Sequence, residues 1–169
     1  MGAFITAFSL LPPSFRGDTG VRGQIHLAST MAGLAFTQSG LGLCHALSHS
    51  LGGIFHVPHG RLNAILLPEV VACNCAAAGR YAKLAKQAGL GANSEIMGVR
   101  NLRNGLIRLR KELRLPATLQ EAGIPPHQLR QHQKEIVQAA LADPCMKTNP
   151  GKVDGVTVQR VLDAVSGRG

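Results

Sequence analysis

Segments in which apolar and polar residues alternate are missing from this sequence, and their absence restricts the fold more than any other feature. The β-branched and aromatic residues that favour strands are dispersed, with no Trp and only Tyr81 among 169 residues. Ala, Leu, Gly and Arg dominate instead, which favours helix, and no segment has the pattern of a strand. The sequence therefore predicts an all-α fold.

Gly and Pro residues divide the chain into successive helical segments. The first helix is expected to end at Pro12-Pro13, and Asp18 is expected to open the second. The expected ranges are 2–11, 18–36, 41–55, 58–75 with an interruption at Pro68, 77–88, 94–113, 126–142 and 157–165, with one further turn at 119–122. No repeat or low-complexity linker separates them, so residues 1–169 are predicted to form a single domain.

The chain is basic, with a formal net charge of +9 from 18 Lys and Arg against 9 Asp and Glu. Basic residues are densest between Arg100 and Arg114. A basic helical module that binds nucleic acid is therefore one alternative. We favour it less, because no aromatic side chains for base stacking are interleaved with the basic ones.

The cysteines do not form a CxxC pair or any spacing typical of a disulfide framework or a zinc ribbon. They are Cys44, Cys73, Cys75 and Cys145. No stretch reaches the roughly 18 apolar residues of a membrane span. Met1–Leu11 is apolar but lacks the basic region and cleavage site of a signal peptide. The sequence thus predicts a cytoplasmic protein without a membrane partner.

Histidines are concentrated in the segment GLGLCHALSHSLGGIFHVPHG, which holds His45, His49, His56 and His59. If residues 41–55 form a helix, the apolar side chains of that helix fall on one narrow stripe that should face the core. This stripe consists of Leu43, Leu47, Leu51 and Ile54. His45 and His49 are four residues apart and lie on the opposite face, near Gly52 and Gly53.

Imidazole is the commonest protein ligand of metals, and two imidazoles on one helix face can share an ion or divide between metal and substrate. His59 adds a third, just inside a helix that Pro58 begins. His56 and His59, three residues apart, could form the pair instead, although His56 lies in a connection without a fixed face. Histidines that are merely solvated or hydrogen-bonded remain the alternative to any site.

The segment AGLAFTQSGLGLCHALSHSLGGIFHVPHGRLNAILLPEV, residues 32–70, closely resembles the second signature region of iron-containing (group III) alcohol dehydrogenases. The segment DPCMKTNP, residues 143–150, resembles the tail motif of the same family. The resemblance extends over nearly the whole chain, and the tail is most similar to the alcohol dehydrogenases of propanediol and ethanolamine utilisation.

This resemblance implies a carboxy-terminal helical domain of the dehydroquinate synthase-like, iron alcohol dehydrogenase fold. In the family, a Rossmann-like amino-terminal domain binds NAD(P), and a divalent metal, Fe²⁺ or Zn²⁺, lies in the cleft between the domains. An Asp and three His bind the metal, and two of these His match His45 and His59. His49 matches a catalytic histidine near the nicotinamide and the substrate, whereas Phe36 and Cys145 match positions of the substrate pocket.

Several features of the family pattern are missing from this sequence, and they limit the function expected of it. No strand–glycine-rich turn–helix unit for a dinucleotide is present, and the only acidic residue before His45 is Asp18, so the Asp-xxx-His helix is missing. In the tail, Gly151 replaces a basic residue and residues 152–156 resemble a small insertion. We therefore expect the chain to supply two of four metal ligands and no cofactor fold.

The expected function is that of the carboxy-terminal part of a metal-dependent, NAD(P)-linked dehydrogenase that interconverts a primary alcohol and an aldehyde. Its expected partners are a small alcohol or aldehyde, the missing amino-terminal domain and a second copy in a homo-oligomer. By itself the chain is expected to be inactive. An inactive remnant, or one half of a split enzyme that needs a partner chain, is the main alternative.

Overall fold

A computed structural model describes residues 1–167, and every regular element among them is helical, without any strand. The predicted all-α fold class is therefore confirmed. In chain order, the elements are α1 (Gly2–Phe15), α2 (Arg22–Ser39), α3 (Leu43–Phe55), α4 (His59–Cys73), the 3₁₀ turn η1 (Cys75–Ala77), α5 (Ala78–Gln87), α6 (Glu95–Glu112), α7 (Pro126–Ala142), the 3₁₀ turn η2 (Pro144–Thr148) and α8 (Gly155–Val165).

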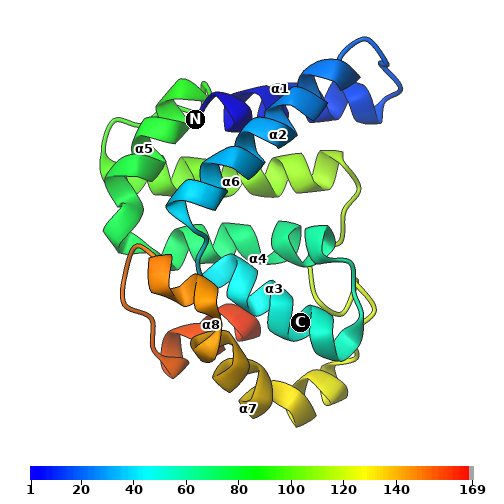
Figure 1. Cartoon of the computed structure of the whole chain (residues 1–169), viewed down its shortest axis with the longest axis vertical. Coiled ribbons are helices and arrows are strands. Elements are labelled where there is room, and N and C mark those ends of the chain that lie inside the picture. The colour runs from blue at the N-terminus through cyan, green and yellow to red at the C-terminus, as the bar shows by residue number, and fades with distance from the viewer. Residues whose placement is uncertain (168–169) are drawn as a thin grey trace.

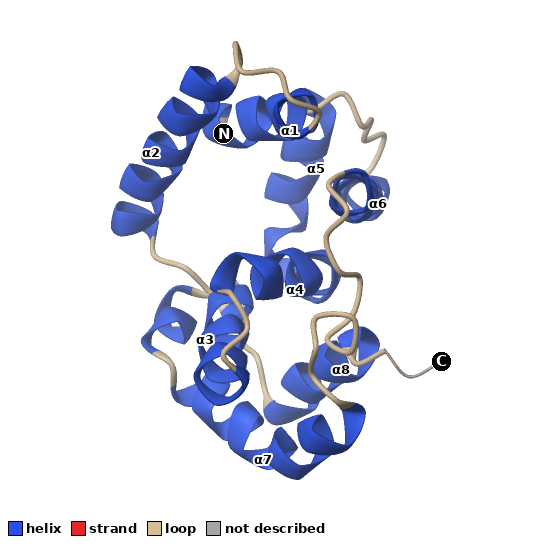
Figure 2. Cartoon of the chain, turned by 90° about the vertical axis from the view of Figure 1, so that its right-hand side faces the viewer, coloured by secondary structure: helices blue, strands red, loops and turns tan. Residues whose placement is uncertain are grey.

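The helices are arranged in two regions that meet at α4 and α6 (Figures 1 and 2). At one end α1 packs against α2, and α5 packs against α6. At the other end α3 lies between α4 and α7, and α8 contacts both α4 and α7. The contact between α4 and α6 joins the two regions. The helices α3 and α4, which carry His45, His49 and His59, lie in the middle and lower part of Figure 1.

The main core lies in the region of α3, α4, α7 and α8, and the predicted stripe of α3 forms part of it. Leu43, Leu47 and Leu51 are completely buried, while Ile54 is half-buried at the edge. They pack with apolar side chains of the three neighbouring helices, among them Leu62, Ile65, Leu66, Leu129, Ile136, Val158 and Leu162. Burial of this stripe turns the opposite face of α3, which carries His45 and His49, away from the core.

The prediction that Pro12-Pro13 ends the first helix is wrong, because α1 continues to Phe15. Proline removes a backbone donor and crowds the preceding turn, but its φ is near the helical value and its own carbonyl can still accept. The Pro12 carbonyl accepts from the Arg16 N–H and the Pro13 carbonyl from the Asp18 N–H, each at 3.1 Å. Pro12 is also buried, which stabilises the continued turn.

Two further boundaries differ from the prediction. Asp18 does not open α2; its carboxylate accepts from the Gly20 N–H at 2.9 Å in a turn, and α2 begins at Arg22 and ends at Ser39 rather than Phe36. Pro68 does not interrupt α4, which runs unbroken from His59 to Cys73. The Pro68 ring is buried, and this burial offsets the loss of the one backbone hydrogen bond that a proline nitrogen cannot donate.

All four cysteines are free thiols. Within residues 1–167, no single helix is long and apolar enough to cross a membrane; α4 and the segment Cys75–Gln87 meet those limits only as a pair bent by 83°.

Candidate metal centre

Three of the clustered histidines meet where α3 crosses the start of α4. Helix α3 begins directly after Gly42, and His45 and His49, four residues apart, lie one turn apart on its outer face. His59 is the first residue of α4. The ring centroids of His45 and His59 lie 5.2 Å apart, as do those of His49 and His59, while those of His45 and His49 are 6.2 Å apart. The structure thus brings together the three histidines singled out in the sequence.

His56 has a different role. It ends α3 in the left-handed conformation, with φ at 55°, and its N–H donates to the Gly52 carbonyl at 3.0 Å. This conformation follows helix ends commonly, although glycine adopts it more easily. The ring contacts of His59 are with His45 and His49, which argues against the alternative pairing of His56 with His59.

The histidine face is open to solvent. His45 is half-buried, His49 and His59 are exposed, and a Cβ added at Gly53 would meet nothing within 4 Å. Burial, followed by the proximity of His59 and His49, lowers the pKa of His45. The lower pKa favours the neutral imidazole, which is the form that binds a metal.

The separation of the His45 and His59 rings is compatible with ligation of one ion. An imidazole bound at about 2.1 Å places its centroid about 3.2 Å from the metal, so two such rings at a tetrahedral angle lie about 5 Å apart. The observed separation is 5.2 Å. Two imidazoles leave the remaining coordination positions to other groups.

His59 is held by a polar network that runs from the surface into the core. Its Nε2 lies 2.9 Å from Asn63 Nδ2, and Asn63 Oδ1 accepts from the Ser48 hydroxyl at 2.7 Å and from the Cys44 thiol at 3.4 Å. Burial raises the pKa of Cys44 to about 12, so this thiol stays protonated and can donate. In this orientation the Asn63 amide donates to Nε2 of His59; a flip, which would turn Ser48 and Cys44 from donors into acceptors, would let the Asn63 oxygen accept an Nε2–H and leave Nδ1 of His59 as a metal-binding atom.

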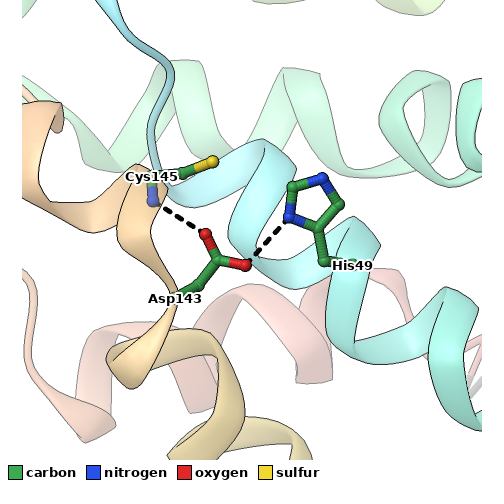
Figure 3. Close-up of side chains that lie close together, drawn as sticks. All are labelled: His49, Asp143 and Cys145. Atoms are coloured by element: carbon green, nitrogen blue, oxygen red, sulfur yellow. Dashed lines mark hydrogen bonds and ion pairs between the residues drawn. The ribbon is translucent and has the colours of Figure 1, made fainter.

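His49 is held by a residue that the sequence did not single out. Its Nδ1 lies 2.8 Å from Asp143 Oδ2, although the two residues are 94 positions apart, and Asp143 Oδ1 accepts from the Cys145 N–H at 2.8 Å (Figure 3). Burial by itself would raise the pKa of Asp143, but the hydrogen bonds from Cys145 and His49 outweigh it and lower the pKa below its usual range. Asp143 opens the tail motif, where only Cys145 was assigned a role.

The donor atoms of His49, Asp143 and Cys145 lie within 4.8 Å of one another and form a second candidate set of metal ligands. We prefer the pair of His45 and His59. Burial, and then the hydrogen bond and charge of Asp143, raise the pKa of Cys145, whereas a metal requires the thiolate. Both carboxylate oxygens of Asp143 already have hydrogen-bond partners.

The tail motif also fixes the start of α3. Asn149 Oδ1 accepts from the Leu43 N–H at 3.1 Å and from the Asn74 amide at 3.1 Å. Asn149 Nδ2 donates to Asn74 Oδ1 at 3.0 Å and to the Gly151 carbonyl at 2.7 Å. The close approach depends on Gly42, where a Cβ would lie 2.6 Å from Asn149 Oδ1. The tail contacts therefore form despite the departures of sequence at residues 151–156.

The two predicted pocket residues are placed differently. Cys145 is half-buried and lies beside the His49–Asp143 pair. Phe36 lies near the end of α2, is 46% exposed, and belongs to a helix that packs mainly against α1. Among residues 1–167, nothing encloses Phe36 in a pocket with the histidines.

Comparison with known proteins identifies the family. Residues 11–166 match the model of the Fe-containing alcohol dehydrogenase family, C-terminal. The chain belongs to the Fe-containing alcohol dehydrogenase family. The predicted family and the helical fold of its carboxy-terminal part are thus confirmed, whereas the roles of the individual residues stay predictions.

Two curated relatives match this chain along most of its length. It is 37% identical over 153 residues to the NADPH-dependent butanol dehydrogenase of Clostridium saccharobutylicum, covering 90% of this chain and 39% of that protein. It is 40% identical over 168 residues to the 1-propanol dehydrogenase PduQ of Citrobacter freundii, covering 92% of this chain and 44% of that protein.

Among solved structures, the iron-containing alcohol dehydrogenase from Thermococcus thioreducens superposes with a TM-score of 0.87 at 31% identity, covering 99% of this chain and 43% of that one. The chain therefore spans about two fifths of the length of the dehydrogenases that it matches.

Proposed function

We propose that this chain is the metal-binding, carboxy-terminal domain of an NAD(P)-linked dehydrogenase that interconverts a primary alcohol and an aldehyde in the cytoplasm. The observation that carries the proposal is the convergence of His45, His49 and His59 on one open face, within a chain of the Fe-containing alcohol dehydrogenase family. The butanol and 1-propanol dehydrogenases among its relatives support a small primary alcohol as the substrate.

In this proposal His45 and His59 hold a divalent ion, Fe²⁺ or Zn²⁺, through one imidazole nitrogen each. When bound, such an ion acts as a Lewis acid toward an alcohol or carbonyl oxygen. His49, whose ring stacks on His59, orients the substrate or transfers its proton. Cys145 and, once the amino-terminal domain covers α2, the apolar side chain of Phe36 contribute to the alcohol pocket.

The remaining metal ligands, expected on a helix at the domain junction, and the NAD(P) site of the amino-terminal domain belong to parts of the enzyme outside these 169 residues, which span about two fifths of the relatives' length. We therefore expect no turnover by this chain alone. The exposed apolar side chains of α2 are the surface that we expect this domain, or a second copy of the chain, to cover. A split enzyme that recruits the domain as a separate chain uses the same surface, whereas an inactive remnant does not need it.

The nucleic-acid alternative has less support. Arg103 of the basic segment pairs with Glu69 at 2.7 Å, and Arg110 donates to the Ile65 carbonyl at 3.3 Å, with its pKa lowered chiefly by burial. These two of the six basic side chains between Arg100 and Arg114 bind within the chain, so they are less available to contact phosphates.

Titration calorimetry with Zn²⁺ and, under anaerobic conditions, Fe²⁺ tests the proposal. We expect weak binding by the wild-type chain, because two neutral imidazoles form an incomplete site. His45→Ala or His59→Ala should weaken it at least about tenfold, since each removes one of two ligands. His49→Ala should spare the ion, and His127→Ala, an exposed histidine of α7, serves as the matched control.

Co²⁺ provides a second measurement, because thiolate ligation produces an intense near-ultraviolet charge-transfer band. The pair of His45 and His59 predicts no such band. If His49→Ala abolished binding, His45→Ala left it intact and the band appeared, the ion would belong to the set of His49, Asp143 and Cys145, and the assignment of ligands would be wrong.

A further inference from the structure

We infer that Asp143 is a positioning residue that fixes His49 as the Nδ1–H tautomer and leaves its Nε2 as a proton acceptor on the histidine face. The inference rests on the proposed function for its catalytic meaning, since His49 is the residue that would handle the substrate proton. The geometry of the hydrogen bond is observed in the chain itself.

Asp143 is well placed to impose an orientation because both of its oxygens are engaged. It stands between α7 and η2, where Oδ1 accepts from the Cys145 N–H at 2.8 Å, and Oδ2 faces His49 Nδ1 at 2.8 Å (Figure 3). Its side chain is only 14% exposed. A carboxylate anchored by a backbone N–H cannot turn away from the imidazole without losing that bond.

The carboxylate also determines which nitrogen carries the proton. An ionised carboxylate only accepts hydrogen bonds, so a neutral His49 must place its hydrogen on Nδ1 and keep the lone pair on Nε2. The ring is stacked on His59 at an interplanar angle of 17° and a centroid distance of 5.2 Å. Two contacts from different elements therefore restrict the ring, as in the carboxylate–histidine pairs that support other active sites.

A second histidine–carboxylate pair in the same chain lacks these restraints. His132 Nδ1 lies 2.9 Å from Glu135 Oε2, but the two residues are one helical turn apart and their side chains are 43% and 65% exposed. In the part of the chain that the structure describes, no backbone N–H donates to the Glu135 carboxylate, and exposed pairs of this kind contribute little. The His132–Glu135 pair is therefore an internal control: its N···O distance is close to that of the His49–Asp143 pair, but no backbone N–H fixes its carboxylate.

The test is a long-range ¹⁵N–¹H spectrum of the histidine-labelled chain in alkaline buffer, without metal or nicotinamide, with His49→Gln to assign the signal. Wild type should show His49 mainly as the Nδ1–H tautomer. In Asp143→Asn, the amide oxygen still accepts from the Cys145 N–H, so the amide NH₂ is directed at His49 Nδ1. The tautomer ratio should then change toward Nε2–H by about tenfold, the size of one hydrogen bond.

The controls separate this role from a merely structural one. Asp143→Ser keeps an acceptor for the Cys145 N–H but cannot reach the imidazole, so it should retain the fold and relax the ratio to that of a solvated histidine. Glu135→Gln should leave His49 unchanged. A wild-type His49 in the Nε2–H form, or a ratio unaffected by both Asp143 variants in a chain with native circular dichroism, would overturn the inference. Neither result depends on metal binding, so the two proposals can fail separately.

Discussion

The α3–α4 pair and the α1–α2 hairpin are both built from apolar-rich helices, yet only the first buries its apolar side chains within the chain. Six of the 13 residues of α3 are buried, whereas Ala28 is the only buried residue among the 18 of α2. Leu27, Met31 and Leu34 of α2 are 62%, 47% and 68% exposed. These three residues share one helix face, which solvent covers instead of protein.

The difference shows which helices are packed within the chain and which are not. The α3–α4 pair is surrounded by α6, α7, α8 and η2, so the geometry of the histidines is held by contacts inside these 169 residues. The α2 helix has mainly α1 as a neighbour, and Figure 2 shows it standing apart from α3 and α4. Since helices in proteins gain most of their stability from tertiary packing, α2 should be the less stable region.

The largest expected effect contrasts the two regions with the same substitution. Leu47 is completely buried in α3, so Leu47→Ala should lower the free energy of unfolding by about 2–5 kcal/mol through lost burial and a residual cavity. Leu34→Ala, at the exposed face of α2, should change it by less than about 0.5 kcal/mol. Urea denaturation followed by circular dichroism measures both; equal losses would mean that α2 is buried in solution.

A somewhat smaller effect is expected from the polar clamp at the start of α3. Asn149→Ala removes the acceptor of the Leu43 N–H and the two hydrogen bonds between the Asn74 and Asn149 side chains, and should cost about 1–3 kcal/mol because buried polar groups lose these bonds. Asn93→Ala, at an exposed loop position, is the control. Amide hydrogen exchange should show faster opening of the first turn of α3 in Asn149→Ala only. Unaltered exchange there would refute the clamp.

The smallest expected effect concerns the exposed face of α2. If this face is a docking surface, the purified chain should self-associate through it. Leu34→Glu should then raise the dissociation constant of self-association about tenfold, or roughly 1.4 kcal/mol. Ile96→Glu, at a position 83% exposed at the start of α6, should have no comparable effect. Sedimentation velocity decides the matter, and a wild-type chain that stays monomeric at high concentration would contradict the proposed docking surface.

Much of the fold could be predicted from local sequence, because helix periodicity and helix ends are local properties. The range 126–142 of α7 was predicted as observed, and Ser94 caps α6 through the Met97 N–H at 3.2 Å, next to the predicted start. The stripe of Leu43, Leu47 and Leu51 identified the buried face of α3. The errors lie at both ends of α2, at Pro12-Pro13 and at Pro68; at Pro12 and Pro68 burial of the proline ring outweighs the local rule against proline in helices.

For the candidate site, the sequence by itself determined the set of histidines and the helix face that carries two of them, since four-residue spacing and an opposed leucine stripe depend only on helix geometry. It also determined the family, through motifs that the chain preserves. The tertiary structure alone decided that Asp143 meets His49, that Asn63 meets His59, and that Phe36 remains outside the ring cluster. Packing of η2 against α3 brings residues 94 positions apart into contact, and no periodicity of the sequence encodes such a pairing.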